Sequence, residues 1–327
     1  MTGIPPQGKR ISRQIIFLLI LAALVVIFPK VVSDQFLLHV IVVANLLALL
    51  AVSWDFVAGF MGQINFGQAM FYGAGAYFIG FLTKAYQIPA ILGLLGGGLV
   101  AVLLSLIVGI PCLRLRGPYY SIATLAFCQV LFTLSMALPG LTGSEEGIRG
   151  IPKFLTNVEA HYYFSFFLLL AFLFVLRVLL RTPFGIRLIS IREDERLSEA
   201  AGTDTARYKI LGTSISAFVA GVAGAYSCYF NSHVSPDTLS IGLTFSAVAA
   251  SVFGGMGTLW GAFVGAYVLT FLNEYLYFMM EYRLLIYPLA IMLILLFSPG
   301  GLLGLFRELG RIFQHGNAAS ARPDKEL

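Results

Sequence analysis

The residues best suited to chemistry or partner recognition lie in one short stretch, Ile191 to Gly202, with the sequence IREDERLSEAAG. Acidic and basic side chains alternate there, although only 11% of the chain is charged. One interpretation is a solvated loop in which the acids balance the arginines. The other is a short exposed helix, because the run from Leu197 to Ala201 favours a helix and Gly202 would end it. Such a helix would offer a binding surface to a partner protein.

Residue types that could bind a metal ion or attack a substrate are scattered elsewhere. Cys112, Cys128 and Cys228 lie in or beside apolar runs without CxxC spacing, so they are predicted to be buried small apolar residues. The four histidines have no HExxH spacing, and we expect them to be solvated; they are His39, His161, His233 and His315. Neither a metal site nor a membrane-embedded enzyme is indicated, because an enzyme needs convergent groups at one depth.

Nucleotide binding is not indicated either. None of the lysines lies in the GxxxxGK[ST] pattern of a P-loop. The chain is therefore expected to carry no ATP or other cofactor of its own, and a partner subunit would have to bind any ATP that drives it.

The composition identifies the elements that must position these residues. A chain of 327 residues that is 58% hydrophobic cannot hide so much apolar surface in a soluble core. Its uncharged runs approach or reach the roughly 20 residues that a helix needs to cross a bilayer. We therefore predict an all-α, polytopic membrane protein, surrounded by lipid, with about 8–10 transmembrane helices, some of them broken or re-entrant.

The distribution of positive charge predicts the topology. A net charge of +5 could suggest a nucleic-acid partner, but in a membrane protein Lys and Arg more often mark the cytoplasmic side. With the N-terminus inside, only Lys30, Lys84, Arg149, Lys153 and Arg283 fall outside. The other Lys and Arg residues fall inside, so both termini are predicted to be cytoplasmic and no nucleic acid is expected to bind.

Hydropathy and charge alternation predict a transmembrane domain over residues 14–306 between cytoplasmic tails 1–13 and 307–327. A periplasmic loop is expected at 139–160 and a cytoplasmic loop at 181–209. The first apolar segment lacks a small-x-small cleavage site and is expected to be a retained helix. The apolar segments are predicted near residues 14–32, 36–58, 65–83, 90–112, 119–138, 161–180, 209–230, 241–256, 258–273 and 284–304.

Glycines at membrane depth allow two interpretations. The run from Gly59 to Tyr77 combines several glycines with three amide side chains, which suits a broken or re-entrant helix. Alternatively, its glycines permit close helix packing and its amides join neighbouring helices. Two later sets of small residues at four-residue spacing are predicted to form smooth packing strips on helices; they are Ala217, Gly221 and Ala225, and Gly257, Gly261 and Gly265.

Ionisable residues within the apolar segments are scarce. Asp55 lies near the predicted cytoplasmic end of its segment, and Glu274 lies near the outer end of another. Carriers that couple a solute to H⁺ or Na⁺ more often place carboxylates inside the membrane. The scarcity of such residues favours a transport path that a separate subunit drives. The alternative is an ion-coupled secondary transporter, which predicts uptake without an ATPase.

Four sequence blocks resemble those of a known family. They are GQINFGQAMFYGAGAY (residues 62–77), LRLRGPYYSIATLAF (113–127), TGSEEGIRGIP (142–152), and a long run from RTPFGIRLISIREDERLSEAAG through SAFVAGVAGAY to SVFGGMGTLWGAFVGA (181–266). Their order and spacing resemble the inner-membrane permease subunit of the branched-chain amino acid ABC importers, a family with relatives for urea and short amides. The resemblance covers most of the chain.

The resemblance implies an importer in the bacterial inner membrane, with two related permease subunits, two ATPase subunits and a periplasmic solute-binding protein. It also implies that the stretch described first is the coupling helix that docks on the ATPase. By position this role falls on Arg192, Glu193, Asp194, Glu195, Glu199, Ala200, Ala201 and Gly202. The match departs from the wider superfamily, where the glycine follows EAA after a three-residue gap, whereas Gly202 follows Ala201 directly.

Two further sets of residues receive predicted roles. A path with few charges would be lined by apolar side chains and by amides and hydroxyls, which suits a small neutral or zwitterionic solute; the amides are Asn45, Gln63, Asn65, Gln68 and Gln129. In the predicted periplasmic loop, Glu145, Glu146 and Arg149 would pair with charges on the binding protein, or they are ordinary solvated residues.

Overall fold

The computed structural model describes residues 34–85, 89–112, 115 and 117–277, with residues 29, 289, 301 and 302. The two predicted tails lie outside these residues, and the predicted segments 14–32 and 284–304 lie almost entirely outside them. The described chain is helical except for one pair of two-residue strands. Its elements are α2 (Gln35–Met61), α3 (Gln68–Ala85), α4 (Ala90–Cys112), α5 (Pro118–Ala137), α6 (Pro139–Thr142), η1 (Ser144–Glu146), β1 (Ile148–Arg149), α7 (Val158–Leu180), α8 (Pro183–Glu193), α9 (Glu195–Ala200), α10 (Thr205–Asn231), β2 (His233–Val234), η2 (Pro236–Leu239), α11 (Ile241–Gly254) and α12 (Leu259–Tyr277).

Eight predicted apolar segments fall in the described part of the chain, and each coincides with a helix. Five helices there are long and apolar enough to cross a membrane, namely α2, α4, α5, α7 and α10. Helices α11 and α12 together form a sixth candidate, but the chain bends by 115° between them. The prediction of an all-α polytopic protein with broken segments is confirmed.

The bend between α11 and α12 corrects one predicted packing strip. Gly257 lies in the turn that joins these helices, with a φ of 78°, and therefore does not extend a helical strip from Gly261 and Gly265. The latter two do face α11, since a Cβ on Gly265 would lie 1.9 Å from the carbonyl oxygen of Ala250. The turn is a backbone feature that spacing alone did not indicate.

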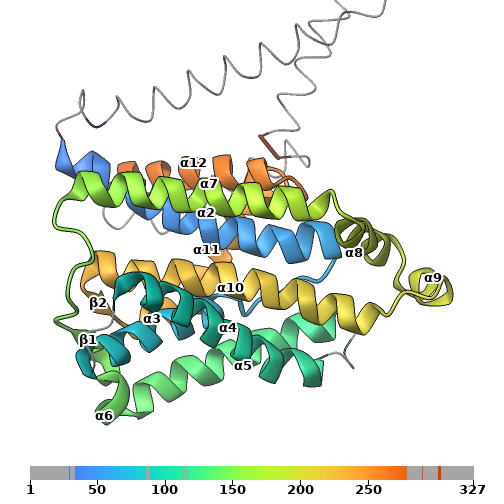
Figure 1. The fold of residues 1–327 in the computed structure, drawn as a ribbon, viewed down its shortest axis with the longest axis horizontal. Helices are drawn as coiled ribbons and strands as arrows, with labels where there is room; N and C mark the ends of the chain where they lie inside the picture. The colour runs from blue at the N-terminus through green and yellow to red at the C-terminus, as the bar shows by residue number, and fades with distance from the viewer. Residues whose placement is uncertain are drawn as a thin grey trace, which may run out of the picture.

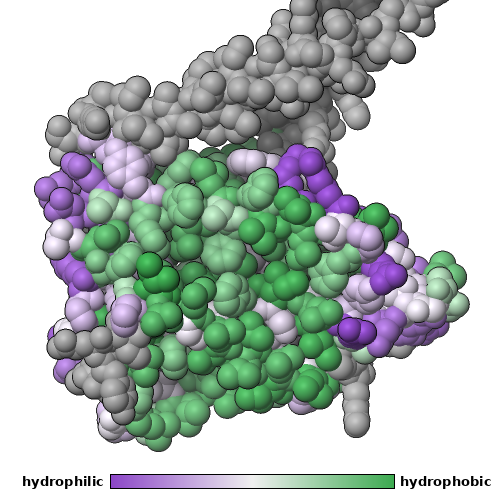
Figure 2. Space-filling view, in the orientation of Figure 1, coloured by the Kyte–Doolittle hydropathy of each residue, from purple (hydrophilic) through white to green (hydrophobic). Residues whose placement is uncertain are grey.

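The long helices run side by side, and short elements lie at the two ends of the bundle (Figure 1). Helices α8 and α9 lie at one end, while α6, β1 and β2 lie at the other. Figure 2 shows a broad apolar surface between these ends and polar residues gathered at each of them. This pattern is that of a membrane-spanning bundle, and it places the predicted loops 139–160 and 181–209 on opposite sides.

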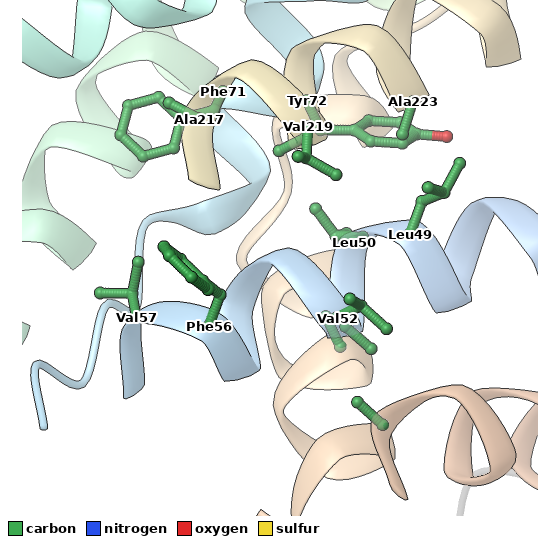
Figure 3. Packing of buried hydrophobic residues seen from close by; sticks show 14 of the residues in the cluster. Leu49, Leu50, Val52, Phe56, Val57, Phe71, Tyr72, Ala217, Val219 and Ala223 are labelled. Carbon is green, nitrogen blue, oxygen red and sulfur yellow. The ribbon is translucent and has the colours of Figure 1, made fainter. Parts of the chain in front are cut away.

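Helices α2 and α10 lie at the centre of the bundle and are buried over most of their length. Leu49, Leu50 and Phe56 of α2 pack with residues of α3 and α10, as Figure 3 shows. By contrast, α4, α5 and α7 expose large apolar side chains such as Leu99 and Phe174 on the outside of the bundle. The outer helices therefore present the surface that lipid or another membrane subunit covers.

Small residues let α10 approach its neighbours closely. A Cβ on Gly221 would lie 2.5 Å from Cβ of Ala101 on α4, and a Cβ on Gly75 of α3 would lie 2.1 Å from the carbonyl oxygen of Gly221. Ala217 and Ala225 on the same strip are fully buried. Such contacts matter in lipid, where helices associate through close packing rather than through exclusion of water. The predicted strip from Ala217 to Ala225 is confirmed.

The glycine-rich run from Gly59 to Tyr77 interrupts the helical path. Helix α2 ends at Met61, and the chain then turns back so that the Asn65 carbonyl accepts a 2.7 Å hydrogen bond from the Trp54 indole. Helix α3 begins at Gln68, which is fully buried. The helix is therefore broken, as one interpretation predicted, and its glycines and amides also make the packing contacts that the other predicted.

The three cysteines are free and buried, as predicted. The prediction that the histidines are solvated is wrong for His161, which is 4% exposed. Its carbonyl accepts a hydrogen bond from the hydroxyl of Tyr226, and its ring nitrogens lie 3.0 Å from that hydroxyl and 3.1 Å from the carbonyl of Leu155. Burial follows from the tight packing of α7 against the centre of the bundle, which a lone histidine does not reveal.

Candidate coupling site and solute path

The stretch that carries most charge folds as two helices with a sharp junction. Pro183 occupies the first turn of α8, where its missing amide hydrogen costs nothing. Asp194 ends α8 with extended backbone and begins α9, its Oδ1 accepting a 3.0 Å hydrogen bond from the amide of Leu197. Gly202, with a φ of 85°, lies just beyond the end of α9. The short helix expected from the sequence is therefore present, and it projects from the end of the bundle (Figure 1).

The inner face of α9 is fixed to its neighbours by its own polar residues. Glu195 forms a 2.5 Å ion pair with Lys209, whose side chain is buried at the start of α10. Ser198 lies 2.7 Å from Ser190 of α8, between the two hydroxyl oxygens. The hydroxyl of Thr205 donates a 2.8 Å hydrogen bond to Glu199. These acids therefore stabilise the position of α9, which is a role that the sequence did not indicate.

The outer face of α9 is exposed. Leu197 is 68% exposed at the tip of the molecule, and Arg196, Ala200, Ala201 and Gly202 are exposed beside it. Leu197 is missing from the predicted contact residues. An apolar residue between charged neighbours in a short exposed helix was the signal that could have identified it.

The other end of the α8–α9 junction is tied to the bundle. Arg192 donates a 2.7 Å hydrogen bond from Nη1 to the carbonyl of Gly59 and forms an ion pair with Glu193. The junction also borders a cleft of about 720 Å³, which the irregular segment after α2 and the first turn of α5 complete. Its lining includes Gln63, Tyr120, Arg192, Glu195 and Lys209.

Two of the predicted path residues form a buried polar network rather than a cavity wall. Gln68 donates hydrogen bonds to Ser53 at 2.8 Å and to Ser216 at 2.9 Å, and its carbonyl accepts one from Asn65 at 3.0 Å. Asn65 and Gln68 are 1% and 0% exposed. The network joins α2, α3 and α10, so its amides hold the break between α2 and α3 in place.

The remaining path candidates are divided between the interior and the surface. Asn45 is fully buried, where its amide donates to Ser165 at 2.9 Å and its carbonyl accepts from Tyr267. Gln63 is half-buried on the wall of the 720 Å³ cleft. Gln129 is exposed on the outer side of α5. Only Gln63 among the five borders this cleft, and a path role for all five stays a prediction.

The opposite end of the molecule has a different character. Ile148 and Arg149 of β1 pair with Val234 and His233 of β2 in an antiparallel ladder that holds the loop after α5 against the loop after α10. Glu145, Glu146 and Arg149 are exposed at this end. Their side chains have no hydrogen bond or ion pair with any part of the chain that the structure describes. They are exposed at this end, and a role in docking the binding protein stays a prediction.

Comparison with known proteins decides the family. The profile described as "Branched-chain amino acid transport system / permease component" matches residues 36–297. The chain belongs to this permease family. As predicted, it is a transport permease and not an enzyme. The match begins at the start of α2 and includes every helix and strand named above.

Curated relatives of the permease include both kinds of Liv subunit. LivM of Escherichia coli (strain K12), a high-affinity branched-chain amino acid transport system permease protein, is 28% identical over 324 residues, covering 90% of the permease and 76% of LivM. LivH of Salmonella typhimurium is 25% identical over 304 residues, covering 83% and 97%. The probable LivH of Methanocaldococcus jannaschii is 27% identical over 295 residues, covering 83% and 93%. No solved structure is significantly similar to the permease.

Proposed function

We propose that the permease forms one wall of an importer that ATPase subunits drive from the α9 end and that a solute-binding protein supplies at the β1–β2 end. The observation that carries this proposal is α9 itself. It is a short helix outside the apolar surface of the bundle. The Glu195–Lys209 ion pair holds it to α10, and Leu197 is exposed on its outer face. A rigid projection of this kind can transmit a movement of a docked ATPase to the bundle.

The proposed assembly contains two related permease subunits, two ATPase subunits and one binding protein. Two observations support a paired permease. Relatives named LivM and LivH both match the chain, and α4, α5 and α7 carry extended apolar faces that a second membrane subunit can share with lipid. The partner subunits would bind and hydrolyse ATP, because the chain has no P-loop.

The proposed orientation places the α9 end and both termini in the cytoplasm of a bacterial cell, with the β1–β2 end in the periplasm. The bias of Lys and Arg supports this choice. Arg187, Arg192, Arg196, Arg207 and Lys209 lie at the α9 end, whereas Arg149 and Lys153 belong to the opposite loop. The ATPase would then meet the side on which ATP is available.

The proposed solutes are branched-chain amino acids. Apart from Asp55, His161 and Lys209, the buried polar side chains of the described chain are amides and hydroxyls, and some bond to one another, such as Gln68 with Ser53 and Ser216. Such a path offers little fixed charge, so it suits a zwitterion with an apolar side chain. It also leaves most of the selectivity to the binding protein. Urea and short amides are the alternative solutes, since they are small and neutral.

The test is reconstitution of the complete complex in vesicles that contain ATP, with binding protein outside. The panel is leucine, isoleucine, valine, urea and acetamide. We expect co-purification with the ATPase and ATP-dependent uptake of the three amino acids. Uptake by the permease alone, driven by an ion gradient and abolished by an uncoupler, would refute the coupling role. Preferential uptake of urea or acetamide would refute the solute assignment and leave the coupling role intact.

A further inference from the structure

One contact joins the base of α9 to the interior of the bundle. Arg192 lies in the last turn of α8, two residues before Asp194, which begins α9. Its Nη1 donates a 2.7 Å hydrogen bond to the carbonyl of Gly59 in the last turns of α2. Helix α8 lies against the end of α2 at this point (Figure 1). A displacement of α9 therefore acts on α2 at Gly59.

A second contact starts one helical turn earlier on the same face of α2. Asp55 precedes Gly59 by four residues and is fully buried. Its Oδ1 accepts a 2.7 Å hydrogen bond from the amide of Gly257 and a 2.8 Å bond from the hydroxyl of Ser251. Ser251 lies near the end of α11, and Gly257 lies in the turn between α11 and α12. Asp55 thus holds the turn of the bent helix pair against α2.

The two contacts meet at a single crowded point. A Cβ on Gly59 would lie 2.6 Å from both Oδ1 of Asp55 and the amide nitrogen of Gly257, so no side chain fits there. A Cβ on Gly257 would lie 3.4 Å from the carbonyl oxygen of Gly59 and 3.7 Å from Nη1 of Arg192. The α11–α12 turn therefore packs directly against the backbone of α2 at Gly59, and the Arg192 side chain from the end of α8 lies beside both.

Burial of the Asp55 carboxylate at this position is unfavourable for stability. Its second carboxylate oxygen, Oδ2, is buried without a hydrogen-bond partner in the described parts of the chain. A carboxylate with incomplete pairing away from water costs stability, and an ionisable residue within a membrane segment commonly serves function. Both of its hydrogen bonds reach α11 and the turn that follows it. Its contribution is therefore to connect α2 with the bent pair.

Glycines allow the chain to turn between α11 and α12. Gly255 and Gly257 have φ values of 118° and 78°, which glycine adopts without strain. Helices α11 and α12 meet there at a bend of 115°, near the residues that border the 720 Å³ cleft. Arg192 belongs to that cleft wall and bonds to Gly59 beside the turn. A shift of Arg192 would therefore move both the cleft wall and the support of the turn.

We propose that Arg192 and Asp55 are positioning residues that transmit movement of α9 through Gly59 to the α11–α12 turn. This proposal rests on the proposed function, because it needs an ATPase that moves α9. It adds a specific route. The turn moves with α9 because Arg192 is hydrogen-bonded to the backbone of α2 and Asp55 is hydrogen-bonded to the backbone of the turn.

The experiment uses Met256, which is 52% exposed within the turn, as a reporter. Met256→Cys is introduced into the full-length chain, whose three native cysteines are buried. The assembled complex with its ATPase is then labelled with a maleimide, with and without ATP plus vanadate. We expect the labelling rate to change severalfold when the ATPase closes. In the Arg192→Gln complex that has bound its ATPase, we expect this change to be lost and uptake to fall.

Two comparisons separate transmission from folding. Arg181→Gln removes the same charge at the same end of the molecule from an exposed side chain, and it should leave the labelling response unchanged. At the other contact, Asp55→Asn keeps an oxygen that can accept from Gly257 and should retain the response, whereas Asp55→Leu should lose it. If Asp55→Leu does not assemble, the Arg192 variants decide, since Arg192→Lys should restore part of the response that Arg192→Gln loses.

The proposal is overturned if Arg192→Gln keeps both the ATP-dependent labelling change and normal uptake. It is also overturned if the Met256→Cys complex transports normally but its labelling never responds to ATP. Both results leave the proposed function standing, because assembly and ATP-driven uptake are intact. Failure of the unaltered chain to bind an ATPase, or uptake without one, would instead refute the proposed function.

Discussion

The two polar ends of the permease use charge in opposite ways. At the α9 end two acids bond to side chains of α10, with Glu195 paired to Lys209 and Glu199 accepting a hydrogen bond from Thr205. At the β1–β2 end, Glu145 and Glu146 extend into solvent without side-chain partners in the described chain. Charge at the first end fixes a rigid element, and charge at the second end is available to a partner. We therefore expect shape and apolar contact to govern docking at α9, and electrostatic attraction to govern docking at the opposite end.

The largest effect is expected from Leu197→Asp, which tests whether apolar contact governs docking at α9. We expect the ATPase to bind roughly 10–100-fold more weakly, because burial of a leucine side chain contributes about 1.5–3 kcal/mol. Binding is measured by titration of the purified permease with ATPase, together with ATP-driven uptake. Leu197→Met is the control and should bind nearly normally. Normal binding by Leu197→Asp would show that α9 does not dock through its apolar tip.

A smaller effect is expected from Lys209→Met, which leaves the carboxylate of Glu195 without its partner. Loss of one member of a buried ion pair costs on the order of 3 kcal/mol, and this value is reduced here because Glu195 is 26% exposed. We expect α9 to become more susceptible to proteolysis and uptake to fall.

The matched double variant Glu195→Gln with Lys209→Met removes both charges. It should recover most of the protease resistance and uptake that Lys209→Met loses, because no unpaired charge remains. If the double variant is worse than Lys209→Met, the ion pair does not act as the support of α9.

The smallest effect is expected at the other end, from the double change Glu145→Arg and Glu146→Arg. Exposed ion pairs contribute about 0.2–1 kcal/mol each, so the binding protein should bind only several-fold more weakly. The association rate should fall most, and the difference should shrink as salt is added. Stopped-flow association at low and high salt measures both. A salt-independent effect, or none, would remove the electrostatic role of this end.

Much of the fold was available from the sequence because lipid imposes a simple rule. Apolar runs of membrane length must form helices that satisfy their own backbone, and α2, α4, α5, α7 and α10 lie where those runs predicted them. The segments around 139–160 and 181–209 lie at opposite ends of the bundle, and their assignment to the periplasm and the cytoplasm stays a prediction. The strip from Ala217 to Ala225 was also correctly assigned to packing, because spacing of four residues places small side chains on one helix face.

The candidate site was only partly predictable. The sequence located α9 and its charged residues, but it could not say which polar side chains face inward, since Ser198 and Glu195 meet Ser190 and Lys209 from neighbouring helices. It likewise grouped Gln68 with the solute path, although the fold engages this amide with Ser53 and Ser216. Partners separated by many residues along the chain are brought together only by packing.

The sequence by itself determined that this protein is a helical membrane protein with an exposed polar helix, because composition and local spacing are enough to fix spans and to mark the stretch that cannot enter lipid. Only the tertiary structure decided that Leu197 points outward, that Gly257 forms a turn, and that Asp55 meets it from another helix. These features depend on contacts between α2, α8 and the α11–α12 pair. Such contacts arise from the way that several helices pack at once, and no local pattern of residues encodes them.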